Sequence, residues 1–144
     1  MTVKNEKGFT LVDLLIGVMI SGILVIASAP NFSRLMHAFR LNGAVRIVWG
    51  DIQKARLLAI KEGQTIRMDF FTNTSYEISR GPTTILRRNL SLAYPGVTVS
   101  ITNNTVSFGS SGTAGGGGKT VEVQNALGTK RFTIITTGRI GNIS

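Results

Sequence analysis

A run of twenty residues without a charged side chain dominates the N-terminal part of the chain. It extends from Leu14 to Ser33 and consists mainly of Leu, Ile, Val, Met and Ala. As a helix it would be about 30 Å long, which matches the hydrocarbon core of a bilayer. The roughly 80 residues that follow the helical region are too few to enclose a helix that is apolar on every side. We therefore expect a membrane-spanning helix rather than a buried core helix.

The charges upstream of the run predict its orientation. Lys4 and Lys7 are opposed only by Glu6, so the positive-inside rule leaves the N-terminus in the cytoplasm and exports the rest of the chain. The alternative is a secretory signal peptide cut after Ala29. That cut would place Pro30 first in the mature chain, a position where proline is poorly accepted. We expect an inner-membrane protein that passes the membrane once and has a periplasmic head.

Composition excludes most catalytic chemistry. The chain has 144 residues, no cysteine and one histidine, which removes disulfides, thiolate sites and histidine-cluster metal sites. No nucleophile, base and orienting group occur at a plausible spacing. The formal net charge of +9 favours an anionic partner without selecting one. We expect a protein that is not an enzyme and binds no cofactor or metal.

Asp13 lies at the cytoplasmic end of the apolar run. An ionisable residue costs about 2.5–3.5 kcal/mol at the centre of a membrane helix and less near its end, so it marks a functional candidate. The stretch KGFTLVDLL, from Lys7 to Leu15, resembles the leader and N-terminal signature of type IV prepilins. This resemblance implies that a prepilin peptidase cuts between Gly8 and Phe9 and methylates Phe9. It also implies that Asp13, where the family usually has glutamate, attracts the N-terminal ammonium of a neighbouring subunit.

After the apolar run, the helical pattern becomes one-sided. Apolar residues recur at steps of four and three on one face, which predicts an amphipathic helix lying on a head domain and ending at Gly63. They are Leu41, Val45, Val48, Ile52, Ala55 and Ala59. Pro30, which pilins often carry at this place, predicts a kink or local melting between the two halves.

The stretch ARLLAIKEG, from Ala55 to Gly63, resembles the helix end of GspH/FimT-type minor pilins and pseudopilins. Arg56 is expected to bond to carbonyls or a carboxylate of the head, and His37 to be a surface or packing residue.

From residue 64 onward the period of the pattern changes to two and turn residues become frequent, which predicts short antiparallel strands in one sheet or two small sheets. The expected strands are 65–71, 76–80, 84–90, 97–101, 105–108, 119–124 and 131–136. A mobile loop is expected at Ser110–Gly118, because this glycine-rich stretch has no following helix and no phosphate-loop ending. The predicted fold class is α+β, a pilin-like long helix on a β-sheet head. The predicted segments are a leader at 1–8, a transmembrane and filament-core helix at 9–33, an amphipathic helix at 34–63 and the head at 64–144.

A set of basic residues in the head is a candidate DNA contact. The set consists of Arg87, Arg88, Lys130, Arg131 and Arg139. These residues would line one face if their strands were neighbours, and the contact would be weak, salt-sensitive and independent of sequence. The ending Gly138-Arg139 also resembles the family, but Gly141 occupies the place of a further arginine that members serving DNA uptake carry. The alternative is a solvated cationic surface.

The resemblance as a whole implies a non-catalytic minor pilin or pseudopilin. Such a subunit helps to initiate or cap a type IV pilus or a type II secretion pseudopilus. The implied partners are other pilins or pseudopilins, the prepilin peptidase, the inner-membrane assembly platform and the lipid bilayer. The alternative function is DNA binding in DNA uptake. The implied location is the inner membrane and then a filament in the periplasm or at the cell surface.

Overall fold

The computed structural model describes residues 8–144, apart from the side chains of residues 27–31. Helix α1 extends over Leu11–Glu62 and so includes both predicted helical halves. It ends where the sequence predicts, because Gly63 follows it with a left-handed φ of 63° that residues with a side chain rarely adopt. The chain divides into two compact units, residues 1–35 and residues 36–144. We call the second the head unit; it contains the C-terminal part of α1 and every strand.

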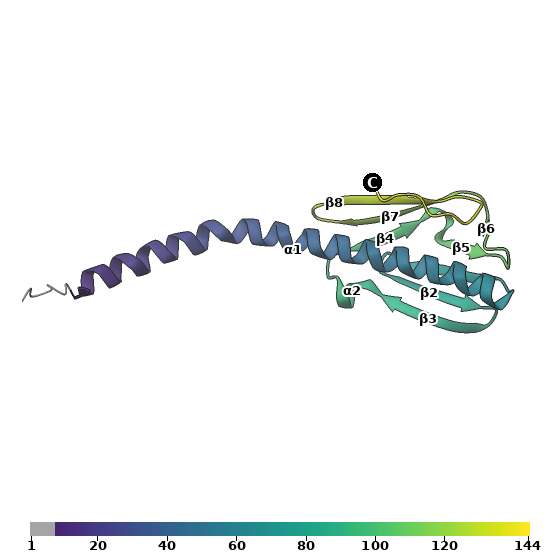
Figure 1. The fold of residues 1–144 in the computed structure, drawn as a ribbon, viewed down its shortest axis with the longest axis horizontal. Coiled ribbons are helices and arrows are strands. Elements are labelled where there is room, and N and C mark those ends of the chain that lie inside the picture. Colours follow the sequence, from purple (N-terminus) through teal and green to yellow (C-terminus); the bar gives the residue numbers. More distant parts are fainter. Residues whose placement is uncertain (1–7) are drawn as a thin grey trace, which may run out of the picture. The chain divides into compact units, whose positions relative to one another are not determined.

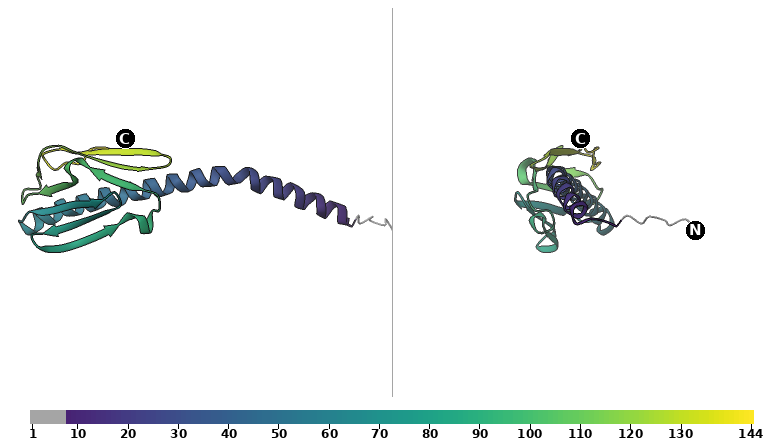
Figure 2. Two further views of the ribbon diagram at one scale, coloured as in Figure 1. Left: turned by 180° about the vertical axis from the view of Figure 1, so that it is seen from behind. Right: turned by 90° about the vertical axis from the view of Figure 1, so that its left-hand side faces the viewer.

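The described residues after α1 form eight strands and two short helical turns. Their bounds are β1 Ile66–Thr72, β2 Ser75–Arg80, β3 Thr83–Asn89, α2 Leu90–Ala93, β4 Thr98–Ile101, η1 Thr102–Asn104, β5 Thr105–Phe108, β6 Ala114–Gly115, β7 Lys119–Asn125 and β8 Gly128–Ile134. They make two antiparallel sheets, of order β3-β2-β1-β5-β6 and β4-β7-β8. Both sheets lie against the head part of α1 (Figure 1; Figure 2). The predicted α+β class with a helix on a β-sheet head is confirmed.

The predicted strands agree closely with the observed ones, with two exceptions. Six of the seven have ends within one residue of the structure. The last begins three residues earlier than predicted, because Gly128 pairs directly with Asn125 across a two-residue turn. The loop predicted over Ser110–Gly118 is interrupted by the short strand β6 at Ala114–Gly115, so that prediction is wrong at these two residues. These two residues pair with β5, and Ala114 is buried there.

One face of α1 supplies the wall of the core. All six stripe residues predicted from the sequence are at most 4% exposed. They join one buried cluster with apolar side chains of both sheets, including Met68, Ile78 and Phe108 from the first sheet and Val121 and Phe132 from the second. Burial of an aliphatic or aromatic side chain contributes about 1.5–3 kcal/mol, so this helix face is a main source of the stability of the head unit.

A buried polar cluster ties α1 to the first sheet. Asp51, which the helical pattern places off the apolar stripe, is only 7% exposed. Its Oδ2 accepts hydrogen bonds from the Tyr76 hydroxyl at 2.5 Å and from Arg88 Nε at 2.5 Å, and its Oδ1 accepts one from Arg88 Nη2 at 3.1 Å. Burial, followed by the hydrogen bond to Asp51, raises the pKa of the Tyr76 hydroxyl well above its ordinary value. The hydroxyl therefore remains a donor to the carboxylate.

We predict that Tyr76→Phe removes a contribution to the stability of the folded chain, and that wild type itself loses this contribution at alkaline pH. The raised pKa keeps Tyr76 protonated in the folded chain, whereas the unfolded chain ionises near pH 10. The contribution is therefore complete below about pH 10 and decreases as the pH rises above that value. At about pH 8 the variant should be less stable than wild type by about 1 kcal/mol. By about pH 11 wild type should have lost about 1.4 kcal/mol that the variant does not lose, so the difference should have disappeared or slightly reversed.

The measurement is urea unfolding of the full chain in detergent micelles, followed by the fluorescence of Trp49, the single tryptophan. Tyr94→Phe is the matched control, because Tyr94 is the other tyrosine of the chain and is not among the hydrogen-bond partners described for the Asp51 carboxylate. An equal alkaline loss of stability in wild type and Tyr76→Phe would contradict the prediction.

Candidate functional site

The predicted cleavage site lies in an open segment before α1. Phe9 is 92% exposed. A Cβ added at Gly8 would meet no atom of residues 8–144 within 4 Å, and the backbone of Gly8 does not lie in the left-handed region. The fold therefore places no demand for glycine at position 8.

Asp13 is held by the residue that precedes the helix. The Thr10 amide donates to Asp13 Oδ2 at 3.0 Å, the Thr10 hydroxyl donates to the same oxygen at 2.8 Å, and the Asp13 amide donates to Thr10 Oγ1 at 3.3 Å. This reciprocal arrangement is a capping box, which satisfies amides that the first turn of a helix leaves unbonded. The sequence reasoning missed Thr10, although a threonine three residues before a carboxylate and next to an apolar run is its known signal.

The N-terminal part of α1 carries a large apolar surface. Every large apolar side chain from Phe9 to Ile26 is at least 50% exposed, a surface far larger than monomeric soluble proteins leave uncovered. Among the residues that the structure describes, no helix combines the length and the apolarity that crossing a membrane requires. Three features of the sequence fall outside the described residues: Lys4 and Lys7 of the leader, and the side chain of Pro30. The kink at Pro30 stays a prediction.

The five basic residues of the candidate DNA contact do not meet the condition for sharing one face. Arg87 and Arg88 lie on β3, at one edge of the first sheet, whereas Lys130 and Arg131 lie on β8, in the other sheet. Because β3 pairs with β2, and β8 pairs with β7 and the C-terminal segment, the strands that carry these residues are not neighbours.

The partners of these residues also differ. Arg87 pairs with Glu77 at 3.0 Å, and Arg131 pairs with Glu122 at 2.7 Å. The third arginine, Arg88, is bound to the buried Asp51. Of these five basic residues, only Lys130 and Arg139 have no ion-pair partner among the described side chains.

Arg56 joins α1 to the loops at the far end of the head unit. Its Nε donates to the carbonyl oxygen of Gly112 at 3.1 Å, which confirms the expected bond to a carbonyl of the head. A Cβ at Gly138 would lie 1.8 Å from the same oxygen, so only glycine allows the two loops to approach each other. At the other end, the backbone carbonyl of His37 accepts a hydrogen bond from Asn125 Nδ2 at 2.7 Å.

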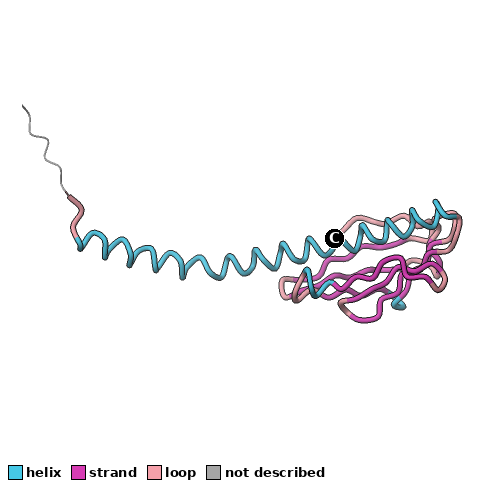
Figure 3. The backbone as a smooth tube through the Cα atoms, turned by 90° about the horizontal axis from the view of Figure 1, so that it is seen from below, coloured by secondary structure: helices cyan, strands magenta, loops and turns pink. Residues whose placement is uncertain are grey.

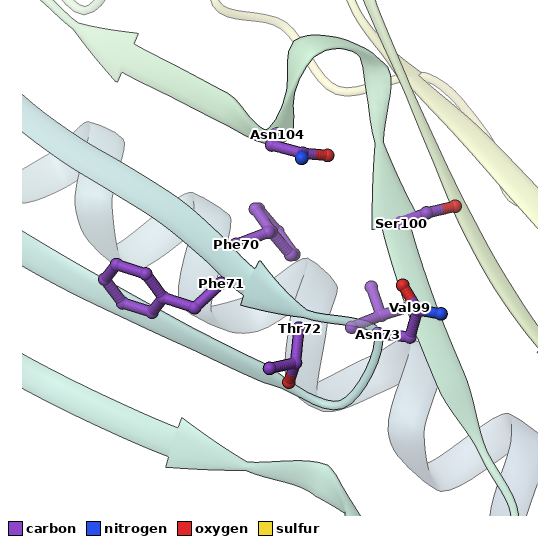
Figure 4. A pocket seen from close by; sticks show the side chains of 7 residues that line it. All are labelled: Phe70, Phe71, Thr72, Asn73, Val99, Ser100 and Asn104. Carbon is purple, nitrogen blue, oxygen red and sulfur yellow. The ribbon is translucent and has the colours of Figure 1, made fainter.

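The small cavity in Figure 4 lies between the end of β1 and β4 and has a volume of about 40 Å³. Its lining residues are Phe70, Phe71, Thr72, Asn73, Val99, Ser100 and Asn104. Phe71 points away from Val99 and Asn73 in Figure 4, and its ring lies 5.7 Å from the Arg87 guanidinium carbon. None of the lining residues is titratable, and the volume is that of about one water molecule. The cavity offers no acid–base chemistry.

Comparison with known proteins identifies the two parts of the chain separately. The sequence profile of the type II transport protein GspH family matches residues 44–138, more than half of the chain. The profile of the prokaryotic N-terminal methylation motif matches residues 3–29. No individually curated protein sequence matches significantly.

Solved structures agree with this assignment at the level of the fold. A crystal structure of the type IV minor pilin FimU from Pseudomonas aeruginosa matches with a TM-score of 0.59 at 16% sequence identity, over 69% of this chain and 85% of that chain. A second crystal form of FimU matches with a TM-score of 0.60 at 16% identity, over 72% of this chain and 92% of that chain. The chain therefore belongs to the GspH family and is a type IV pilin-like minor pilin or pseudopilin.

Proposed function

We propose that this chain is a non-catalytic minor subunit that helps to initiate or cap a type IV pilus or a type II secretion pseudopilus. It would be made as a single-pass inner-membrane prepilin with a periplasmic head, cut between Gly8 and Phe9, methylated at Phe9 and extracted into the filament by the assembly platform. The observation that carries the proposal is the combination of a structurally unnecessary Gly8 with a capped, exposed apolar helix directly behind it. Exposed apolar surface of this extent needs lipid or sibling helices as its environment.

Asp13 has two separable duties in this proposal. Its Oδ2 takes both bonds from Thr10, while no partner for Oδ1 occurs among the described residues. A terminal ammonium of a neighbouring subunit would fit the remaining oxygen as a charge-assisted hydrogen bond. Because the helix sits in apolar surroundings in lipid or filament, this pairing would be stronger than it is in water.

The first prediction concerns processing. Gly8→Val should block cleavage in cells that contain the prepilin peptidase, because the change is free of steric conflict in the fold and so affects only recognition. Gly17→Ala, a change at another glycine with open space around it, should leave cleavage intact. Mass spectrometry of the purified protein reads the result. An uncut wild-type N-terminus, or a cut at Ala29, would refute the proposed maturation.

The second prediction separates the two duties of Asp13. Asp13→Ala should abolish incorporation into filaments, and Asp13→Glu should retain it. Asp13→Asn keeps an acceptor for the Thr10 hydrogen bonds but carries no charge, so it should lose incorporation about as severely as alanine. Immunoblotting of sheared filaments measures incorporation. Normal incorporation of Asp13→Asn would mean that helix capping alone is the role of this residue.

DNA binding is the second candidate function, and Lys130 and Arg139 favour it because they have no carboxylate partner among the described side chains. We predict binding of duplex DNA by the full chain in detergent that decreases by about tenfold or more between 50 mM and 200 mM salt. Arg139→Ala should weaken it, whereas Arg131→Ala, which removes an already paired cation, should weaken it less. Gel shifts at graded salt decide the matter: absence of binding at the lowest salt removes this candidate.

A further inference from the structure

The carboxylates of the head unit are all engaged. Asp51, Glu62, Asp69, Glu77 and Glu122 are its only acidic residues, and each forms an ion pair with an arginine, at separations from 2.5 to 3.8 Å. The same residues, 36–144, contain thirteen Lys and Arg. Thirteen minus the five paired arginines leaves eight cations with no ion-pair partner among the described side chains. They are Arg40, Arg46, Lys54, Arg56, Lys61, Lys119, Lys130 and Arg139.

Five of these eight cations lie on α1. Arg46, Lys54 and Lys61 are exposed and follow one another at steps of eight and seven residues, which places them on one side of the helix. That side faces away from the buried stripe, and Figure 3 shows the strands gathered on the other side of this part of α1.

Large apolar side chains share this exposed side. Phe39 is 64% exposed, Leu57 is 63% exposed and Ile60 is 47% exposed. We call the set of Phe39, Arg46, Lys54, Leu57, Ile60 and Lys61 the cationic ridge. It extends for about 33 Å along α1 and contains no acidic residue.

We propose that the cationic ridge is the docking face for an acidic helix face of a different filament subunit, and that it disfavours a second copy of this chain. The inference rests on the proposed filament function and adds a choice of partner to it. Two ridges in contact would oppose cation to cation with no acid between them, and like charges at a closely packed interface cost affinity. A partner with apolar residues and carboxylates would cover Phe39 and Leu57 and also neutralise Arg46 between them.

The order of the side chains along the ridge disfavours the other anionic partners. Arg46 lies between Phe39 and Leu57 on nearly the same line of the helix. Insertion of the ridge into a bilayer would therefore bury the guanidinium together with the two apolar residues, which is costly. Phosphates of a nucleic acid would satisfy the cations but would leave Leu57 and Ile60 uncovered.

The test uses the chain itself as a designed acidic partner. The chain has no cysteine, and Gly50 lies at the middle of the ridge with open space around an added Cβ, so Gly50→Cys reports contact between two ridges. Full chains carrying Gly50→Cys, with and without Lys54→Glu/Lys61→Glu, are oxidised in detergent separately and as a mixture. The mixture should give at least about tenfold more cross-chain disulfide than either protein alone, and high salt should remove the gain.

The matched control carries Gly50→Cys together with Lys130→Glu/Arg139→Glu, which reverses two unpaired cations outside the ridge. Mixing this control with the Gly50→Cys chain should give no gain. An equal gain in disulfide yield would mean that net charge rather than the ridge is responsible. Efficient disulfide formation by the Gly50→Cys chain alone would make a second copy the occupant of the ridge. Either result overturns the proposal. Lys54→Gln/Lys61→Gln should give an intermediate gain, and equal urea midpoints establish that the variants fold.

A second arm identifies the natural partner in cells, with a photo-crosslinking residue at Leu57. The crosslinked peptide should come from a different pilin or pseudopilin and contain carboxylates, and its yield should fall about tenfold in Lys54→Glu/Lys61→Glu but not in the control. A crosslink to a copy of this chain overturns the proposal. The proposal is also overturned if brominated phosphatidylglycerol in nanodiscs quenches the fluorescence of Trp49 and if Lys54→Glu/Lys61→Glu abolishes this quenching. That result would assign the ridge to lipid. The disulfide experiment does not depend on cleavage at Gly8, so failure of the proposed function and failure of the ridge are distinguishable.

Discussion

The packing of one face of α1 against two separate sheets is the interaction on which the head unit depends. The sheets share no strand, and the buried stripe of the helix joins their apolar faces into one core. A backbone hydrogen bond of 2.6 Å from Val99 to Asn73 is a further link between them. Loss of the helix would therefore expose the inner faces of both sheets at once. This requirement explains why the region carries strict apolar periodicity on its buried face.

The same arrangement determines where charge accumulates. The outer faces of both sheets carry arginines beside carboxylates, as in the pairs of Arg87 with Glu77 and of Arg131 with Glu122. The one acid on the inner side of α1, Asp51, is consumed by Arg88. Five of the eight cations of the head unit that have no ion-pair partner among the described side chains therefore lie on α1. Exposed pairs contribute little to stability. Their main consequence is to neutralise arginines of the two sheets, where Lys119 and Lys130 remain without a carboxylate partner among the described side chains.

The sequence was sufficient to predict the parts of this fold that follow from local pattern. The apolar stripe, the end of α1 at Gly63 and six strand positions arise from periodicity and turn residues, which neighbouring residues encode. The pairing of Asp51 with Tyr76 and Arg88 could not be predicted, because it joins residues 25 and 37 positions apart. The separation of Arg87 and Arg88 from Lys130 and Arg131 depends on strand order, which periodicity does not contain. The β6 strand was missed because two residues within a glycine-rich stretch carry no alternating pattern.

If Asp13 pairs with a neighbouring ammonium as proposed, the capping box at the N-terminal site would help this shorter carboxylate to form the pair. Aspartate at position 13 lies three residues after Thr10, the spacing at which a carboxylate returns to the residue preceding the helix. Glutamate would reach further, but the aspartate binds both the amide and the hydroxyl of Thr10 through a single oxygen. The second oxygen is then held in a fixed orientation at the positive end of the helix dipole, where a negative charge is favoured. A carboxylate fixed in this way would lose little side-chain entropy on binding an ammonium, which would offset part of the reach lost with the missing methylene.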